Sequence, residues 1–396
     1  MLSDILVVGA GLSGATIARE YAEAGLMVHV IDKRDHIGGN VYDYIDAETG
    51  IRVSKYGAHL FHTEDEEVWN YVQRFGRWKR WDHRVLADVS GVLVPVPVNI
   101  NTVNGLLGTT LKNSDEMDRW LNEEQVHVSE VKNSEDVARN RVGERLYNMM
   151  FKPYTLKQWD KMPADLEPSV LERIPVRNNF DDRYFTDRFQ GLPVDGYTSI
   201  VKNMLDHPKI QVQLETDWQD YLERAANCCE IIFTGPIDVY FKDKGLPPLE
   251  YRSINFDISR VKTAGFYQPN SVVNYPDASC EYTRCVEYKH FLNQKSDWTI
   301  IAKESTCSEG EPYYPVPTQK NRDVYRQYAD LAASEKGVHF VGRLASYKYF
   351  NMDQAIRNSL DYFRNVLKPN ISTYEKDWPK LLVTEKIDSD ALNLGS

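Results

Sequence analysis

The chain has 396 residues, enough for two or three structural units with a large buried core. Its 47 basic and 58 acidic side chains give a formal net charge of -11, so its long-range field repels nucleic acid, and an anionic ligand needs a local basic site. The five cysteines show no C-x-x-C spacing, which argues against a disulfide framework and a zinc site. The sequence has no apolar run of roughly 20 residues and no signal-peptide pattern, which argues against an integral membrane segment and secretion. We therefore expect a cytoplasmic protein.

The N-terminal residues predict a β-α-β unit. Residues 5–8 form a short apolar run, typical of a strand buried in a parallel sheet, and the motif G-A-G-L-S-G follows at residues 9–14. A helical pattern covers residues 13–24, and a second strand over residues 27–31 ends at Asp32. The acidic residue therefore lies about 20 residues beyond the glycine turn, as the dinucleotide-binding fingerprint requires.

Each residue of this fingerprint has a physical role. Gly9 permits the tight turn, and Gly11 lets a pyrophosphate approach the helix N-terminus. Gly14 allows close packing of helix and strand, and Asp32 can accept hydrogen bonds from ribose hydroxyls. The alternative is a glycine turn without a ligand.

A second glycine pair indicates which dinucleotide binds. Residues 33–40 read K-R-D-H-I-G-G-N, and Gly38 and Gly39 follow the acidic residue closely. This pattern resembles the extended motif of FAD-binding oxidase-like folds, which NAD-binding domains usually lack. An ordinary loop is the competing interpretation.

Two histidines three residues apart, His59 and His62, lie in the segment V-S-K-Y-G-A-H-L-F-H-T of residues 53–63. No cysteine or carboxylate in this segment completes a metal site, so we predict no metal. The histidines either face a flavin or are satisfied structural residues.

Residues 101–173 have a helical texture. Asn113 and Asn133 are candidate N-caps of two helices, and the segment ends in an aromatic cluster at residues 151–159. Such aromatics could stack on a planar base, although a cluster of this kind alone is more often helix-packing core. The following charged segment, residues 168–175, lies between two prolines and is predicted to be a loop, either a mobile lid or a solvated connector.

The remaining chain returns to strands. A helix that opens at Gly196 leads to a strand at residues 210–214, and another buried strand precedes Gly235. Two-residue alternation over residues 249–304 predicts an antiparallel sheet. A last strand ends in Gly342 and Arg343 before a helix, which provides a second anion-friendly turn.

We therefore predict an α/β fold with three parts: a Rossmann-like FAD-binding domain, an inserted helical domain and an antiparallel β-sheet domain that binds substrate. The predicted boundaries are 1–85, 195–245 and 318–390 for the FAD-binding domain, 100–172 for the helical domain, and 86–99, 173–194 and 246–317 for the sheet domain.

Taken together, these motifs resemble those of the bacterial UDP-galactopyranose mutase family. The resemblance rests on motifs spread from residue 5 to about residue 365: residues 9–14, 37–40, 56–63, 154–159, 274–275, 282–284, 312–317, 342–343 and 352–353. It implies interconversion of UDP-galactopyranose and UDP-galactofuranose through an adduct between the sugar and N5 of FAD, which must be reduced. It also implies a reductant such as NAD(P)H and a homodimer or larger homo-oligomer.

The resemblance also assigns residues to roles. It implies that the arginines Arg173 and Arg284 stabilise the departing diphosphate and that His59 and His62 face the flavin; these four are the predicted catalytic residues. The predicted cofactor-binding residues are Gly9, Gly11, Ser13, Gly14, Asp32, Lys33, Gly38, Gly39, Asn40, His59, Gly235, Gly342, Arg343 and Met352. The predicted substrate-binding residues are Phe151, Tyr154, Thr155, Trp159, Arg173, Tyr184, Asn274, Arg284, Tyr314, Tyr349 and Asn351.

One position departs from the family pattern, since many relatives carry Asp where this chain has Asn351. A neutral amide still donates and accepts hydrogen bonds, and it removes a like-charge repulsion beside a diphosphate. Two other functions share the N-terminal fingerprint: an FAD-dependent oxidoreductase of the amine-oxidase type, and a non-catalytic protein that binds a flavin or a sugar nucleotide.

Overall fold

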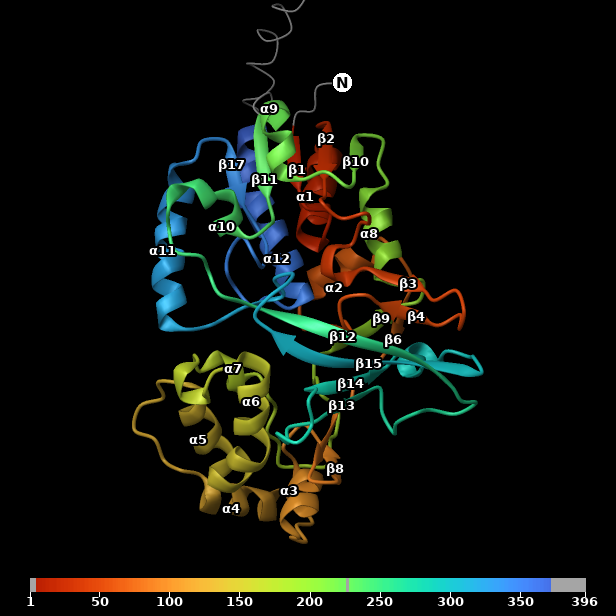
Figure 1. Ribbon diagram of the computed structural model, residues 1–396, viewed down its shortest axis with the longest axis vertical. Coiled ribbons are helices and arrows are strands. Elements are labelled where there is room, and N and C mark those ends of the chain that lie inside the picture. Colours follow the sequence, from red (N-terminus) through yellow and green to blue (C-terminus); the bar gives the residue numbers. More distant parts are fainter. Residues whose placement is uncertain (1–4, 226–227, 372–396) are drawn as a thin grey trace, which may run out of the picture.

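The computed structural model describes residues 5–225 and 228–371. The predicted boundary at residue 390 therefore lies outside the described residues. The fold has a parallel sheet with covering helices at one end, a long antiparallel sheet across the middle, and a group of helices at the other end (Figure 1).

The parallel sheet has five strands in the order β10-β2-β1-β11-β17. Their bounds are β1 Ile5–Val8, β2 Val28–Ile31, β10 Ile210–Gln213, β11 Glu230–Phe233 and β17 Val338–Phe340. All neighbouring pairs run parallel, so the carboxyl ends of the strands share one edge of the sheet. The predicted strands at residues 5–8 and 27–31 and the strand before Gly235 are confirmed to within one residue.

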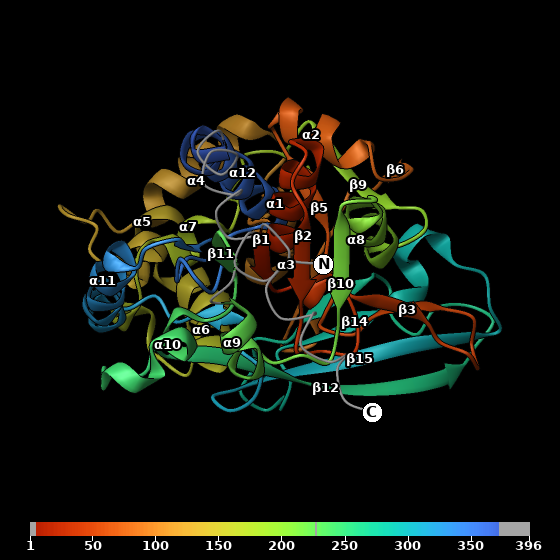
Figure 2. The same ribbon diagram turned by 90° about the horizontal axis from the view of Figure 1, so that it is seen from above.

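Helices cover this sheet and bury its apolar side chains. The helix α1 (Leu12–Glu23) lies between α8 (Tyr197–Leu205) and α12 (Met352–Tyr362), and the packing is visible from above in Figure 2. Ile5, Val7 and Ile17 are fully buried in the core that these helices share with the sheet. Two further helices, α2 (Glu66–Gln73) and α11 (Gln319–Ser334), complete this part of the molecule.

The second sheet is mostly antiparallel and has seven strands in the order β16-β12-β15-β14-β13-β7-β8. Their bounds are β7 Leu86–Val89, β8 Val92–Pro95, β12 Tyr251–Lys262, β13 Val272–Asn274, β14 Arg284–Glu287, β15 Trp298–Cys307 and β16 Tyr314–Pro315. The antiparallel prediction for residues 249–304 is confirmed, and the one parallel pair joins β13 to β7. The fold also has two small sheets. One pairs β3 (Asp43–Ile45) with β4 (Arg52–Ser54), and the other has β9 (Phe189–Pro193) between β5 (Phe61–Thr63) and β6 (Trp78–Arg80).

The helical part contains α3 (Ile100–Leu107), α4 (Ser114–Glu124), α5 (Ser134–Leu146), α6 (Lys152–Trp159) and α7 (Ser169–Glu172). Asn113 and Asn133 cap α4 and α5 as predicted, since each side chain accepts a hydrogen bond from a backbone N–H of the first turn. The aromatic cluster at residues 151–159 lies on α6 and the turn before it. The residue boundaries of the three domains remain predictions.

The prediction of a loop for residues 168–175 was wrong in part. The short helix α7 occupies its centre, and Arg173 is the C-cap of this helix. Val170 and Leu171 are buried in the apolar core of the helical part, which explains why this charged segment folds as a helical turn.

The other short helices are α9 (Leu222–Ala225) and α10 (Ile237–Tyr240). None of the described helices is both long enough and apolar enough to cross a membrane.

Candidate functional site

A crevice made of backbone lies at the carboxyl edge of the parallel sheet. Gly9 ends β1 with φ of 111°, and a Cβ atom there would lie 2.1 Å from the hydroxyl of Thr234. A Cβ atom on Gly14 would lie 1.9 Å from the carbonyl oxygen of Gly9. Only glycine therefore allows helix α1 to begin this close to the end of β1, with its N-terminal N–H groups facing the crevice.

The loop that contains Gly38 and Gly39 packs against the loop that contains Ala10 and Gly11. A Cβ atom on Gly39 would lie 2.9 Å from the Cα atom of Gly11, and the N–H of Gly38 donates to the carbonyl of Ala10 at 2.8 Å. Asp32 follows β2, and its carboxylate accepts from the N–H of Ala10 at 2.8 Å. Two loops that are distant in sequence thus form one narrow crevice.

The other end of this crevice comes from late in the chain. A Cβ atom on Gly342 would lie 2.8 Å from the hydroxyl oxygen of Ser13, so the turn after β17 meets the start of α1. Gly235 follows β11, the strand between β1 and β17. Lys33 instead forms an exposed ion pair with Glu311 at 2.9 Å.

This set of groups fits a dinucleotide. A helix N-terminus and glycine backbone suit a pyrophosphate, and a carboxylate at the end of β2 suits ribose hydroxyls. A side chain at Gly9, Gly14 or Gly39 would collide with the protein atoms that shape this crevice.

A cavity of about 530 Å³ continues from this region between the long sheet and the helical part. All eleven predicted substrate-binding residues line it, and so do Asn40, His59, His62, Arg343 and Met352. The structure therefore brings together side chains from residue 40 to residue 352.

Three polar residues cross the floor of this cavity on adjacent strands. Asn274 on β13 is directly opposite Arg284 on β14, and Arg284 is directly opposite Glu304 on β15. The Arg284 guanidinium donates to the hydroxyl of Tyr154 on α6 at 2.8 Å and lies 3.5 Å from the Glu304 carboxylate. The side-chain oxygen of Asn274 is buried and finds no hydrogen-bond partner among the described residues.

The second arginine enters from the short helix α7. The Arg173 guanidinium donates to the side-chain oxygen of Asn351 at 3.1 Å and lies 4.0 Å from the ring centroid of Tyr349. Asn351 also holds its own helix, because its backbone N–H donates to the side chain of Gln354 at 2.9 Å. The neutral amide at this position is thus the acceptor for a cavity arginine.

Tyrosines form the wall between the two arginines. The rings of Tyr314 and Tyr349 stack with centroids 5.3 Å apart, and Arg343 lies 5.1 Å from the Tyr349 ring centroid. Burial by itself would raise the pKa of Tyr349, but Arg173, Arg343 and Arg284 together lower it below the ordinary tyrosine value. Burial raises the pKa of Tyr314, so its phenol stays protonated.

Three histidines also line the cavity. Burial lowers the pKa of His59 to about 4, and its Nδ1 lies 2.8 Å from the carbonyl of Gly57. Burial, with Arg284 and His62 nearby, lowers the pKa of His83 to about 3. His62 differs, since its Nδ1 lies 3.1 Å from the carboxylate of Asp187.

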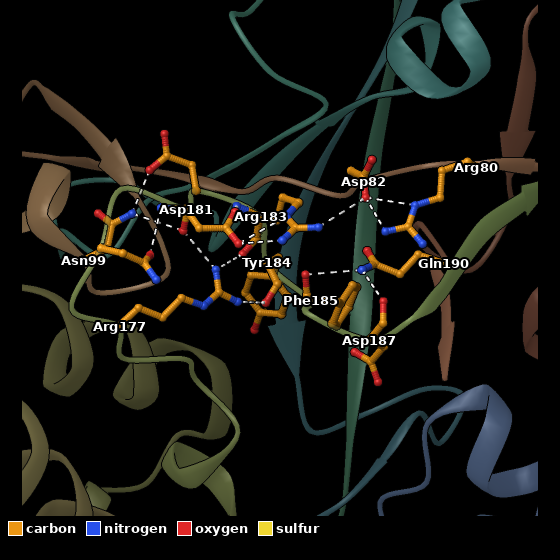
Figure 3. A network of polar contacts seen from close by, with 12 residues as sticks. Arg80, Asp82, Asn99, Arg177, Asp181, Arg183, Tyr184, Phe185, Asp187 and Gln190 are labelled. Atoms are coloured by element: carbon orange, nitrogen blue, oxygen red, sulfur yellow. Dashed lines mark hydrogen bonds and ion pairs between the residues drawn. The ribbon is translucent and has the colours of Figure 1, made fainter. Parts of the chain in front are cut away.

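A network of polar contacts holds residues 181–187 against the cavity (Figure 3). The Arg177 side chain donates to the carbonyls of Asp181, Arg183 and Tyr184. The Asn99 side chain donates to the Asp181 carbonyl at 3.2 Å. This network fixes the backbone that presents Tyr184 to the cavity.

The sequence did not predict several cavity residues. These are His83, Arg177, Phe185, Asp187 and Glu304. None of them lies in a recognisable motif. The signal in the sequence was the D-R-Y-F segment at residues 182–185, in which two charged residues precede two aromatic ones.

Among residues 5–225 and 228–371, no group of three histidine, cysteine or carboxylate side chains is placed to hold a metal ion.

Comparison with known proteins gives consistent matches. The family model described as UDP-galactopyranose mutase matches residues 149–349, and that of an NAD(P)-binding Rossmann-like domain matches residues 7–75. A probable UDP-galactopyranose mutase of Klebsiella pneumoniae is 38% identical over 362 residues, which cover 90% of this chain and 93% of that protein. A dTDP-fucopyranose mutase of Escherichia coli is 36% identical over 377 residues, 93% of this chain and 100% of that protein.

The fold agrees with these matches. The crystal structure of a reduced UDP-galactopyranose mutase superimposes with a TM-score of 0.72 at 17% sequence identity, covering 92% of this chain and 96% of that one. The predicted combination of a Rossmann-like domain with an antiparallel sheet and helices is confirmed.

Proposed function

Because the chain belongs to the UDP-galactopyranose mutase family of nucleotide-sugar mutases, we propose that it interconverts UDP-galactopyranose and UDP-galactofuranose. One observation carries the proposal: a single cavity, next to a dinucleotide crevice, is lined by four arginines, Arg173 and Arg284 among them, and by several tyrosines. In an acidic protein this is the local basic site that an anionic substrate needs.

The arginines provide the diphosphate site. Arg284 and Arg173 enter from opposite walls, and a planar guanidinium can donate to two phosphate oxygens at once. Tyr184, Tyr314 and Tyr349 add phenolic donors. Fixed donors and cations stabilise the negative charge that develops on the diphosphate as the bond to the sugar breaks.

The uracil base binds against α6. Tyr154 supplies an aromatic face, and Phe151, Thr155 and Trp159 surround it. The orphaned side-chain oxygen of Asn274 faces the same cavity and accepts a hydrogen bond from the nucleotide or the sugar.

The cofactor in the crevice is FAD. The N-terminus of α1 would hold its pyrophosphate, Asp32 would accept hydrogen bonds from its ribose, and His59 and Met352, which line the cavity, would contact its ring system. When bound and reduced, the flavin would supply nucleophilic chemistry at its electron-rich N5. The chain's own part is to place the sugar against that ring, to hold the diphosphate and to exclude water.

The test is an assay on UDP-galactofuranose with and without a reductant such as dithionite or NAD(P)H. We expect conversion to UDP-galactopyranose, detected by chromatography, only with reduced enzyme and without net consumption of reductant. Equal rates with oxidised enzyme would contradict the role of the flavin. Steady oxygen consumption without sugar conversion would indicate an oxidase instead.

A second candidate substrate is the pair of dTDP-fucose isomers, since the E. coli dTDP-fucopyranose mutase is 36% identical over 93% of this chain. The two substrates differ in the base, the ribose and the C6 group of the sugar. The same assay run with both furanose forms decides between them by the ratio of kcat/KM. A higher value for dTDP-fucofuranose would assign the chain to that substrate.

A further inference from the structure

The proposed reaction, on which the inference below rests, requires a proton to move on the sugar. In the pyranose form O5 belongs to the ring and O4 carries a proton, whereas in the furanose form O4 belongs to the ring and O5 carries the proton. Each turnover must therefore remove one proton from O4 and add one to O5. A side chain that exchanges protons near neutral pH makes both transfers faster.

Among the described residues, three histidines line the cavity, and two of them are unsuited to this exchange. Burial keeps the pKa of His59 at about 4 and that of His83 at about 3, so both are neutral at pH 7 and resist protonation. His62 is the one whose ring contacts a carboxylate.

The geometry of the pair formed by His62 and Asp187 is well defined. The His62 Nδ1 atom lies 3.1 Å from a carboxylate oxygen of Asp187, and the His62 ring stacks on Phe185 with centroids 3.6 Å apart and an angle of 12°. The hydrogen bond from His62 holds the pKa of Asp187 below its ordinary value, so the carboxylate is ionised and only accepts. Nδ1 therefore donates, and Nε2 is the nitrogen left for a ligand.

The chain fixes both members of the pair through β9. Gln190 on β9 is directly opposite His62 on β5. The Gln190 side chain donates to the carbonyl of Asp187 at 2.8 Å and to the carbonyl of Phe185 at 3.3 Å (Figure 3). One buried amide thus aligns the carboxylate and the stacking ring with the strand that carries His62.

We propose that His62, positioned by Asp187, exchanges the proton between O5 and O4 of the sugar. As the C1–O5 bond breaks, its electron pair stays on O5, which takes the proton from Nε2 of the imidazolium. As O4 then bonds to C1, the O4 proton returns to Nε2. The imidazole ends each turnover in the state in which it began, and no proton is consumed.

The surroundings of His62 include three titratable groups. Asp187 contacts it directly, and Asp353 on α12 and His83 lie close enough to influence its charge. Burial raises the pKa of Asp353, and one of its carboxylate oxygens has no hydrogen-bond partner among the described residues. His83 is neutral, so Asp187 is the ionised group in direct contact with the His62 ring.

The test is Asp187→Asn in the reduced holoenzyme, with Asp195→Asn as the control. Asp195 follows the end of β9 and forms an exposed ion pair with Arg77, outside the cavity. We expect Asp187→Asn to lower kcat at least about tenfold, within the usual range of acid–base catalysis, and to leave KM within about twofold. The control stays near the wild type.

A second readout separates proton transfer from departure of UDP. With ¹⁸O in the bridge between C1 and the β-phosphorus, scrambling of the label reports breakage and re-formation of that bond. Asp187→Asn should scramble the label at the rate of the wild type while converting less sugar.

A third readout needs no turnover. Nitrogen NMR of the histidine side chains in the oxidised protein should show the proton on Nδ1 of His62 in the wild type, and a changed Nδ1 signal in Asp187→Asn. Unchanged kcat, or equal losses of conversion and label scrambling, would overturn the proposal. If the wild type neither converts UDP-galactofuranose nor scrambles the label, the proposed function itself has failed, which is a distinct result.

Discussion

The cofactor crevice and the substrate cavity are built in opposite ways. The crevice is made mainly of backbone, with glycines whose missing side chains let protein segments pack closely against one another. The cavity is made of large polar and aromatic side chains that come from helices, strands and turns. A ligand that must come close to the main chain needs a loop built from glycines, whereas a ligand that needs charge and stacking requires polar and aromatic side chains.

The two regions also differ in how far apart their partners lie in the sequence. In the crevice, Ala10 and Asp32 are 22 residues apart. In the cavity, Arg284 and Tyr154 are 130 residues apart, and Arg173 and Asn351 are 178 apart. The glycine fingerprint of the crevice is therefore local, although Thr234 and Gly342 reach it from late in the chain, whereas the cavity has no such local part.

The largest effect is expected from Gly14→Ala, which disrupts the packing of α1 against the end of β1. The new Cβ atom would lie 1.9 Å from a backbone oxygen, so α1 must shift away from β1. Such overpacking costs about 1 to 3 kcal/mol of stability or more. We expect the protein to lose its bound flavin, with affinity reduced at least about tenfold, or about 1.4 kcal/mol.

The measurement is the flavin absorbance per protein after purification, together with thermal unfolding. Gly265→Ala is the matched control, because no atom lies within 4 Å of the added carbon. A Gly14→Ala protein with full flavin content would show that the crevice tolerates side chains, and the contrast drawn above would fail.

The next effect is expected from Arg284→Ala, which removes a charge from the cavity and leaves the crevice intact. Loss of one preorganised donor to a developing anion lowers turnover by about 10² to 10³. Flavin content should stay normal, so the two regions are separable by mutation. Steady-state kinetics of the reduced enzyme gives the result, with Arg326→Ala, an exposed surface arginine, as the control. Near-normal turnover would remove Arg284 from the diphosphate site.

The smallest effect is expected from Tyr349→Phe. Loss of a hydrogen bond to a charged group should lower kcat/KM about tenfold, near the lower end of the 1.5–3 kcal/mol that such bonds contribute. The phenol donates only while it is protonated. Burial by itself would raise the pKa of Tyr349, but three arginines outweigh this effect and lower the pKa below the ordinary tyrosine value. In the wild type kcat/KM should therefore fall as pH rises through that pKa.

This alkaline limb should be absent from the kcat/KM profile of Tyr349→Phe. Tyr325→Phe, which removes a hydroxyl from a tyrosine outside the cavity, should keep the limb. If the limb persists in Tyr349→Phe, another group causes it and Tyr349 is not a donor to the diphosphate.

Much of the fold was predictable because its signals are local. Apolar runs, glycine turns and the N-caps Asn113 and Asn133 act within a few residues, so they predicted the first strands and the helices at their observed places. The turn around Arg173 was predicted less well. Its charges suggested a loop, but buried Val170 and Leu171 bind it to the helical core.

The cavity could be predicted only in part. The resemblance to a family identified residues that the structure places together, although it did not give their contacts. Asp187 and Glu304 were missed because an isolated acidic residue carries no local signal. Their importance depends on two partners: the His62 side chain contacts Asp187, and Arg284 lies opposite Glu304 on the neighbouring strand.

The sequence by itself determined the dinucleotide fingerprint, since glycine conformations, a helix N-terminus and an acid at the end of a strand act within 40 residues. It also determined that any anion site had to be local, because the net charge is -11. Only the tertiary structure decided which of three cavity histidines keeps a carboxylate partner and which two are desolvated. Burial and pairing depend on what packs around a side chain, and the chain supplies those neighbours only when distant segments meet.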